Sequence, residues 1–364
     1  MDGKEYMCRP CHMTKTLIRQ MTGSGVSMLL LGLALTGCGA QSSSAPTGKS
    51  AKPLPTVVIG KAVDTIPFTV VNVAQAEHFF QKNGVKVKDE LLNGSSQANA
   101  ALVGGSLQFV CEAANPLLLA RSKGIPLISI DALDRGVTLQ LAVSNKWLKA
   151  HPVPKNASLK TKMSDLNGAI YGEVSTTDLS DFELLRRMAG LPATSGYQVD
   201  EVGNEAEDAV EVEKGTIDAF MVSPPSSMQV FDQGYAREFV DRYDIPSWKN
   251  TAYDIFVTTS TYAKAHPNIT RDVATAVAES LNFMIAHPHQ TLAIEEHHFP
   301  SINARILKQS VAFIPFASNG LQSQARWNNA VQMARETGFI KGNVVAPQNQ
   351  AWTNQYIDLA KLKQ

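Results

Sequence analysis

Short apolar runs and amphipathic segments alternate along the chain from residue 56 onward. Residues 56–60 and 85–92 have the length and patterning of strands, while residues 70–83 space their apolar side chains as a helix does and stop at Gly84. Residues 96–103 form another helical segment that begins with a serine, and residues 104–130 follow as turn, strand, helix, turn and strand. Strands alternating with helices predict an α/β protein with a largely parallel sheet.

The same alternation returns in a second part of the chain. A short helix at 163–166 leads into a strand at 169–172, and the polar turn VSTTD at 174–178 opens the helix DLSDFELLRRMAG. A helix at 204–214 and the strand IDAFMVSPP follow, and after a further strand the pattern is mostly helical to the C-terminus. We therefore expect two α/β lobes, with a helical tail after the second.

The N-terminus has the organisation of an exported protein. A basic segment precedes an apolar run of about 11 residues, too short to span a bilayer, which ends in Leu35-Thr-Gly-Cys38. Because this ending resembles a bacterial lipobox, we expect residues 1–37 to be a lipoprotein signal peptide and Cys38 to receive the lipid. Residues 38–55 are polar and rich in Ser, Pro and Ala, and predict a flexible tether. An ordinary signal peptide ending near a cysteine is the alternative.

The cysteines and the charged residues exclude several classes of function. CRPCH at residues 8–12 matches a c-type haem attachment motif, but it lies in the predicted leader and upstream of Met13, a second possible start, so no cofactor is expected. Once the leader is removed, Cys38 and Cys111 are the remaining cysteines. Because Cys38 is expected to carry the lipid, no internal disulfide is possible. The 33 basic and 33 acidic residues form no basic stripe, which argues against nucleic acid. The chain has no phosphate-binding G-x-x-x-x-G-K-[ST] motif.

Four segments, in order and spacing, resemble nitrate-, sulfonate- and taurine-type solute-binding proteins of ABC transporters, whose relatives include thiamin-pyrimidine-precursor proteins. They are LVGGSLQFVCEAANPLLLARSKGIPLISI, KTKMSDLNGAIYGEVSTTDLSDFELLRRMAGL, EVEKGTIDAFMVSPPSSMQ and WNNAVQMARETGFI. The chain departs from the pattern at Asn167-Gly168-Ala169, where G-K is usual, and at Ser223-Pro224, where many relatives carry an aromatic and an acidic residue. These departures leave the substrate class open.

The resemblance implies a two-lobe periplasmic-binding-protein-like fold of type II, with two crossovers and the ligand in the interlobe cleft. Lobe 1 would comprise residues 56–143 plus 255–364, and lobe 2 residues 144–254. The implied function is capture of a small organic or oxyanionic solute, such as a sulfonate, taurine or nitrate, for an ABC permease. We expect a monomer without enzymatic activity, anchored by lipid at the outer face of the bacterial cytoplasmic membrane or in the periplasm.

Ligands of open α/β sheets bind beyond the carboxyl ends of strands, where loops enter helix N-termini. Five such loops supply the candidate ligand-binding residues, which are Asp64, Thr65, Phe68, Ser96, Gln97, Glu112, Asn115, Ser175, Thr176, Thr177, Asp178, Ser223 and Pro224. Asp178 and Asn115 have the alternative role of helix N-caps, Phe68 that of lobe packing and Pro224 that of a strand stop. If Asp64, Glu112 and Asp178 face the cleft, an amine-bearing or neutral heterocyclic solute becomes more plausible than a sulfonate.

Three other functions use parts of the same sequence. An enzyme on this fold would need Cys111, which is close to a predicted ligand loop, as its nucleophile. A sensory receptor would use the same cleft and pass its closed state to a signalling partner. A metal site would draw on the segment HPHQTLAIEEHH, although neither histidine pair has four-residue spacing, so a polar helix end is the preferred interpretation. The possible ligands there are His287, His289, His297 and His298, with Glu295 or Glu296.

Overall fold

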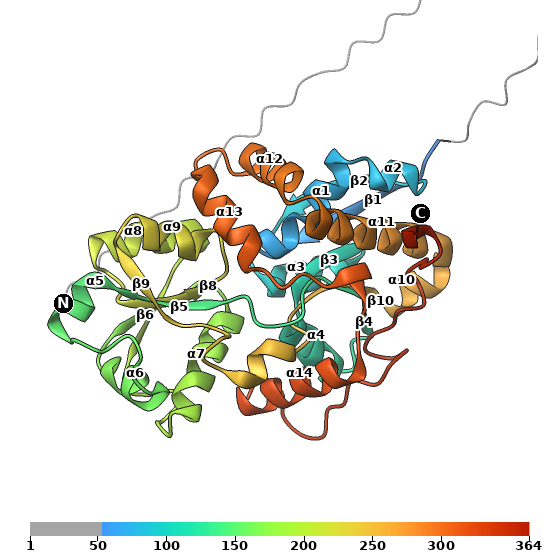
Figure 1. The fold of residues 1–364 in the computed structure, drawn as a ribbon. Helices are drawn as coiled ribbons and strands as arrows, with labels where there is room; N and C mark the ends of the chain where they lie inside the picture. Colours follow the sequence, from blue (N-terminus) through green and yellow to red (C-terminus); the bar gives the residue numbers. More distant parts are fainter. Residues whose placement is uncertain (1–52, 364) are drawn as a thin grey trace, which may run out of the picture. The chain divides into compact units, whose positions relative to one another are not determined.

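The computed structural model describes residues 53–363, so the predicted signal peptide, Cys38 and most of the tether lie outside the described residues. In the described part, ten strands form two five-stranded sheets, each with its own apolar core. Helices cover both sheets, and the chain passes between them twice (Figure 1). No helix within residues 53–363 has both the length and the apolar character needed to cross a bilayer.

The first sheet has the strand order β2-β1-β3-β10-β4. Its strands are β1 (Thr56–Lys61), β2 (Lys86–Leu91), β3 (Phe109–Ala113), β4 (Leu127–Ala132) and β10 (Asp254–Thr259). The earlier helices of this lobe are η1 (Ile66–Thr69), α1 (Val70–Ala76), α2 (Phe79–Lys82), α3 (Ser95–Gly104) and α4 (Ala114–Ser122). The later ones are α10 (Ser260–Ala265), α11 (Pro267–Ala286), α12 (Pro288–His298), α13 (Ala304–Phe313) and α14 (Gln324–Glu336).

The second sheet has the order β7-β6-β8-β5-β9. Its strands are β5 (Gln140–Ser144), β6 (Ile170–Glu173), β7 (Gln198–Glu201), β8 (Ala219–Val222) and β9 (Ala236–Val240). Its helices are α5 (Asn145–Ala150), α6 (Leu159–Asp165), α7 (Thr176–Met188), α8 (Glu205–Lys214) and α9 (Ser226–Asp232). The predicted lobe boundary at residue 143 falls inside β5, a strand that pairs with β8 and β9 of this sheet.

Each sheet contains one antiparallel strand, which the alternation of strands and helices did not predict. β10 runs antiparallel to β3 and β4, and β5 runs antiparallel to β8 and β9. Both are the first strands formed after the chain crosses from the other sheet. A strand reached through a helix of its own lobe enters the sheet parallel, whereas a strand arriving directly from the neighbouring lobe enters from the opposite end. The local pattern is the same in both cases, so only the topology distinguishes them.

The single helix predicted for residues 70–83 is interrupted at His78, which has a left-handed φ of 61°. The break turns α2 so that Phe80 is buried and the Phe79 ring meets the Phe283 ring of α11 edge-on, with centroids 5.9 Å apart. Burial of two aromatic side chains against α11 accounts for a kink that helical periodicity alone does not show.

The two crossovers, residues 133–139 and 241–253, lie against each other. The Val137 amide donates a hydrogen bond to the Trp248 carbonyl at 3.0 Å, and the Trp248 side chain is almost fully buried. Gly136 packs so closely here that a Cβ added to it would lie 2.5 Å from the Trp248 carbonyl oxygen. The contact between the crossovers therefore requires a residue without a side chain at position 136.

We expect Gly136→Ala to lower the free energy of unfolding by about 1–3 kcal/mol, because the new methyl group meets backbone that cannot rotate away. Chemical denaturation would measure the change. Gly104→Ala is the matched control, since Gly104 lies in α3 with open space around its Cα and should be neutral or slightly stabilised by the same substitution. Equal effects at both positions would contradict the proposed close contact.

Candidate ligand-binding site

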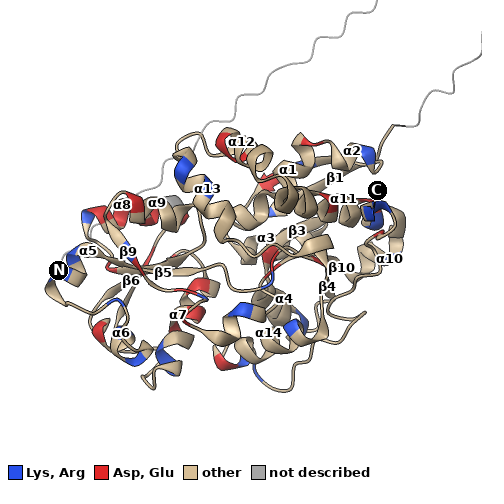
Figure 2. Cartoon of the chain, in the orientation of Figure 1, with Lys and Arg blue, Asp and Glu red and all other residues tan. Residues whose placement is uncertain are grey.

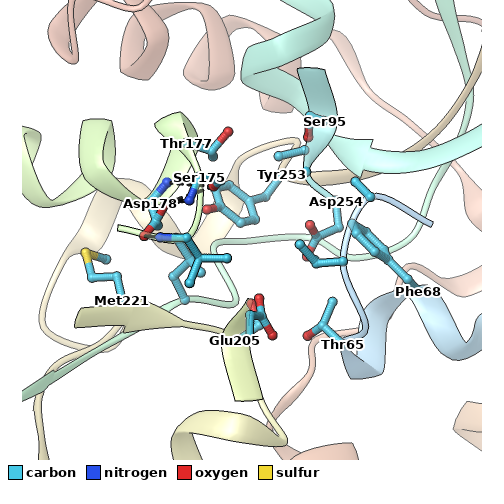
Figure 3. Close-up of a pocket in the computed structure, with 17 residues that line it drawn as sticks. Thr65, Phe68, Ser95, Ser175, Thr177, Asp178, Glu205, Met221, Tyr253 and Asp254 are labelled. Carbon is cyan, nitrogen blue, oxygen red and sulfur yellow. Dashed lines mark hydrogen bonds between the residues drawn. The ribbon is translucent and has the colours of Figure 1, made fainter. Parts of the chain in front are cut away.

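A cavity lies between the two lobes, and its volume together with the open solvent at its mouth is about 520 Å³. Both sheets supply its walls, through loops that follow β1, β3, β6 and β8, the first turns of α3, α7 and α8, and both crossovers (Figure 3). The lining residues are Ala62, Val63, Thr65, Phe68, Gly94, Ser95, Ala113, Leu139, Val174, Ser175, Thr177, Asp178, Glu205, Met221, Ser223, Tyr253 and Asp254.

The lobes touch at the edge of this cavity. The backbone N–H of Ile66 donates to the Pro224 carbonyl at 3.0 Å, and the Thr65 hydroxyl donates to the same oxygen at 2.8 Å. Elsewhere Arg305 of α13 pairs with Asp232 of α9. Direct contacts at two places therefore join the two lobes, as expected when the lobes are closed.

The first turn of α7 forms one wall. Ser175 is the N-cap and forms a capping box with Asp178, whose Oδ1 accepts from the Ser175 amide at 2.7 Å and from its hydroxyl at 2.8 Å. The Asp178 Oδ2 accepts from the Val174 amide and the Tyr171 hydroxyl, both at 3.3 Å. Burial raises the pKa of Asp178 to about 7, although the Ser175 hydrogen bonds act in the opposite direction. Asp178 is thus a wall residue, but the N-cap role that the sequence left as its alternative belongs to Ser175, and Asp178 is the third helical residue of the capping box.

The start of α8 forms the facing wall. Glu205 lines the cavity, and its Oε2 is shielded from solvent and accepts no hydrogen bond from any described residue. Burial, followed by the charges of Asp178, Asp64 and Asp254, raises the pKa of Glu205 well above its usual range. One turn later, burial raises the pKa of Asp208 to about 9. The wall therefore contributes acidic groups without a local counter-charge.

Asp254, the first residue of β10 directly after the second crossover, supplies a third carboxyl group. Its Oδ2 accepts from the Thr138 hydroxyl at 2.8 Å, and Thr138 is also 2.7 Å from the Ser223 hydroxyl. The Asp254 amide donates to Asp134 Oδ1 at 3.3 Å. Burial raises the pKa of both aspartates, and the Asp254 carboxyl raises that of Asp134 further. Two acidic groups are thus held together where the chain crosses between the lobes.

The adjacent Tyr253 ties this crossover to α7. Its hydroxyl donates to the Asp181 Oδ2 at 2.8 Å. Asp181 is fully buried, and burial raises its pKa to about 8 despite that hydrogen bond. The ring of Tyr253 lines the cavity, so its position there depends on a carboxyl group of the second lobe.

The structure brings part of the predicted site together. The predicted residues that line the cavity are Thr65, Phe68, Ser175, Thr177, Asp178 and Ser223. Pro224 contributes its carbonyl oxygen to the contact between the lobes rather than lining the cavity. Ser96 and Thr176 line a neighbouring pocket that shares Ser95 and Ser175 with this cavity.

The remaining predicted residues point elsewhere. The Asp64 carboxylate lies 2.8 Å from His298 Nε2, and although burial acts to raise its pKa, the His298 and Lys61 contacts lower it overall. Gln97 accepts from the Asn93 amide. Glu112 is fully buried within β3, where Asn99 donates to its Oε2 at 2.9 Å. Asn115 is buried in the first turn of α4, after the N-cap Ala113.

Sequence reasoning missed Glu205, Tyr253 and Asp254. Glu205 opens a helix directly after a strand, so the rule that selected the other loops applies to it as well. Asp254 and Tyr253 were assigned to the boundary between lobes, and only the pairing of the crossovers shows that they reach the cavity.

The residues named for the alternative enzyme and metal functions lie away from the cavity or are engaged in other contacts. Cys111 is fully buried in β3 and does not line the cavity, and burial raises the pKa of its thiol, which disfavours the reactive thiolate. In α12, Glu295 is buried and accepts from the Thr69 hydroxyl at 2.6 Å, while His298 pairs with Asp64. Across residues 53–363, no three His, Cys, Asp or Glu side chains are placed to hold a metal ion.

The buried acids give stability a definite dependence on pH. Asp178, Asp181 and Asp208 hold their protons in the folded chain up to about pH 7, 8 and 9, whereas in the unfolded chain such groups ionise near about pH 4. Between these limits the folded state binds more protons, so the free energy of unfolding falls as pH rises. Urea denaturation should therefore show greater stability at about pH 5.5 than at about pH 8.

Asp181→Asn should reduce this slope, because it removes one of the groups that bind the extra protons. Asp200→Asn on the exposed edge strand β7 is the control and should leave the slope unchanged. Stability that rises between about pH 5.5 and pH 8 would contradict the assignment.

Comparisons with known proteins agree with this architecture. Among solved structures, a protein from Bordetella bronchiseptica matches with a TM-score of 0.72 and 19% identity, over 85% of this chain and 97% of that one. The alkanesulfonate-binding protein SsuA from Xanthomonas axonopodis, bound to MOPS, matches at 0.64 and 16%, over 83% and 100%. The nitrate-binding protein NrtA from Synechocystis matches at 0.64 and 14%, over 80% and 83%. A search of curated protein sequences gave no match.

These likenesses establish the fold, which is the two-lobe type II fold of periplasmic binding proteins expected from the sequence. A family model described as "NMT1/THI5 like" matches residues 65–291, which include both crossovers and every strand of the second sheet. The chain belongs to the NMT1/THI5-like family.

Proposed function

We propose that the protein is a solute-binding component of an ABC import system, which captures a small molecule between its lobes and delivers it to the permease. The observation that carries this proposal is the cavity itself, whose walls come from both lobes and whose rim is joined by hydrogen bonds from Thr65 and Ile66 to the Pro224 carbonyl. A ligand held this way is recognised only when the lobes meet. The closed form is then a distinct shape that a permease can recognise.

The cavity suits a small organic molecule. Phe68, Leu139, Met221 and the ring of Tyr253 give apolar surface, and several hydroxyl groups provide directional hydrogen bonds. Pockets with mostly apolar walls and a few placed polar groups are typical small-molecule sites. The relatives named for alkanesulfonate and nitrate make an oxyanion one candidate class, although their identity to this chain is below 20%.

The proposal includes a lipid anchor on Cys38, which would hold the protein at the outer face of the cytoplasmic membrane or in the periplasm. The support is the lipobox-like sequence Leu35-Thr-Gly-Cys38 after an apolar run. Metabolic labelling with a fatty acid should label the protein, and Cys38→Ala should remove the label. A sensory receptor would share the cavity and the anchor, and would differ by binding a signalling partner in place of a permease.

If the protein binds a solute in this cavity, the solute should stabilise the folded chain and close the two lobes. A thermal-shift screen of sulfonates, nitrate, pyrimidines, aromatic acids and amines should identify a class that raises the melting temperature, since a ligand of the folded state stabilises it by mass action. The same ligand should decrease the radius of gyration in small-angle scattering if it closes the lobes.

Ser95→Trp should abolish the ligand-induced shift, because Ser95 lines the cavity and the indole would fill it. Ala100→Trp is the matched control on the same helix, since Ala100 is exposed and lies outside the cavity, so the shift should stay intact. Failure of every solute class to shift the melting temperature, or a shift that survives in Ser95→Trp, would contradict binding in this cavity.

A further inference from the structure

The charged side chains that line the cavity are all acidic. They are Asp178, Glu205 and Asp254, and the lining contains no Lys, Arg or His (Figure 3). The nearest buried lysine, Lys61 at the end of β1, donates to Asn72 at 3.0 Å and pairs with Asp89 and Asp64, none of which lines the cavity. Nothing on the cavity wall is therefore available to pair with an anionic ligand through a cationic side chain.

Two of the three helix N-termini at the cavity, those of α7 and α8, are partly neutralised by the protein, whereas α3 has no acidic residue in its first turn. Helix N-termini carry a partial positive charge and often hold anions. At α7 this position is taken by Asp178, which accepts the amides of Val174 and Ser175. At α8 it is taken by Glu205, the first residue of a helix whose first turn also carries Glu207 and Asp208, so that acidic residues cluster along α8 (Figure 2). An oxyanion placed at either helix would face a carboxyl group.

The three lining carboxyl groups differ in how far the described residues satisfy their oxygens. All four acceptor contacts of Asp178 go to its own lobe. Glu205, in contrast, has a shielded Oε2 without a described hydrogen-bond donor, and it lines the cavity. Asp254 is almost fully buried, and its side-chain partners are the hydroxyl of Thr138 and the carboxyl group of Asp134, neither of which carries positive charge. Buried carboxyl groups without a cation are costly, and a ligand that carries positive charge would remove that cost.

We propose that the ligand is a compact organic cation, with a protonated amine, amidine or guanidine group that pairs with Glu205 and Asp254. This inference rests on the proposed solute-binding function and deepens it. The flat apolar surfaces of Phe68 and Tyr253 would hold the remainder of the molecule, and Tyr253 is fixed by its hydrogen bond to Asp181. Aromatic faces next to a charged group are also favourable for cations.

Ligands that share a skeleton but differ in charge test the preference of the cavity for a cation. Benzamidinium, benzamide and benzoate share one skeleton, as do the planar trio guanidinium, urea and nitrate. Isothermal titration calorimetry and thermal shift at millimolar ligand should show the cation of at least one set binding about tenfold or more tightly than its neutral partner, a difference of about 1.4 kcal/mol. The anion should bind more weakly than either.

Glu205→Gln should reduce the preference for the cation about tenfold, because the amide keeps the size of the side chain and removes its charge. Glu296→Gln is the matched control, since Glu296 is exposed on α12 and lies outside the cavity. If Glu205→Gln does not fold, Asp254→Asn provides the second test of the same charge, with circular dichroism reporting its fold.

The outcomes separate the two proposals. Tighter binding of benzoate or nitrate, equal binding within each set, or an unchanged preference in Glu205→Gln and Asp254→Asn would overturn the cationic ligand and leave solute binding in place. If no member of either set binds and the wider solute screen is also negative, both proposals fail together.

Discussion

The contact between the two crossovers is the constraint on which the rest of the structure depends. Gly136 lets the first crossover approach the Trp248 carbonyl, and the hydrogen bond from Val137 holds the two segments together. That contact places Thr138 beside Asp254 and Ser223, so the polar groups at the base of the cavity come from three segments far apart in sequence. If the crossovers separated, the cavity would lose one wall as well as the hinge between its lobes.

The buried carboxyl groups show that the site is not arranged for maximal stability. Asp134 and Asp254 are both buried and lie next to each other, and Asp181 is buried with one oxygen that has no described partner. Groups of this kind usually reduce stability unless a charge or hydrogen bond compensates them. Glu112, Asp131 and Glu295 are buried away from the cavity, but Asp178 and Asp254 line it, and buried groups with perturbed pKa values in a cleft are typical of binding sites.

The sequence predicted the fold well because the fold depends on local patterns. Apolar runs, the serines that begin α3 and the polar turn before α7 each identify an element from neighbouring residues alone. The antiparallel direction of β5 and β10 was not predictable in this way, since it depends on which lobe the chain comes from. His78 is similar, because its left-handed conformation serves the packing of Phe79 and Phe80 against a helix some 200 residues later.

The candidate site was predictable at the level of loops more than of side chains. Loop positions follow from strand order, and the loops after β1, β6 and β8 do reach the cavity. Side-chain direction depends on pairing partners that the pattern does not contain. Glu112 alternates inward within β3 and meets Asn99, while Asp64 turns to His298, a residue from the helical tail. Tyr253 and Asp254 are wall residues only because the second crossover folds against the first.

The charge of the cavity also bears on when the lobes close. Closing them removes Glu205 and Asp254 from water, and without a cation this raises the free energy of the closed form. A cationic ligand lowers that free energy. It gains little from one wall alone, because its partners Glu205 and Asp254 lie on different segments. A ligand shifts an equilibrium only by its difference in affinity for the two states, and here that difference is set by whether both carboxyl groups can reach one positive charge. Under the proposed cationic ligand, the uncompensated acids raise the free energy of the closed lobes and the ligand lowers it, so that the closed form is favoured when the ligand is bound.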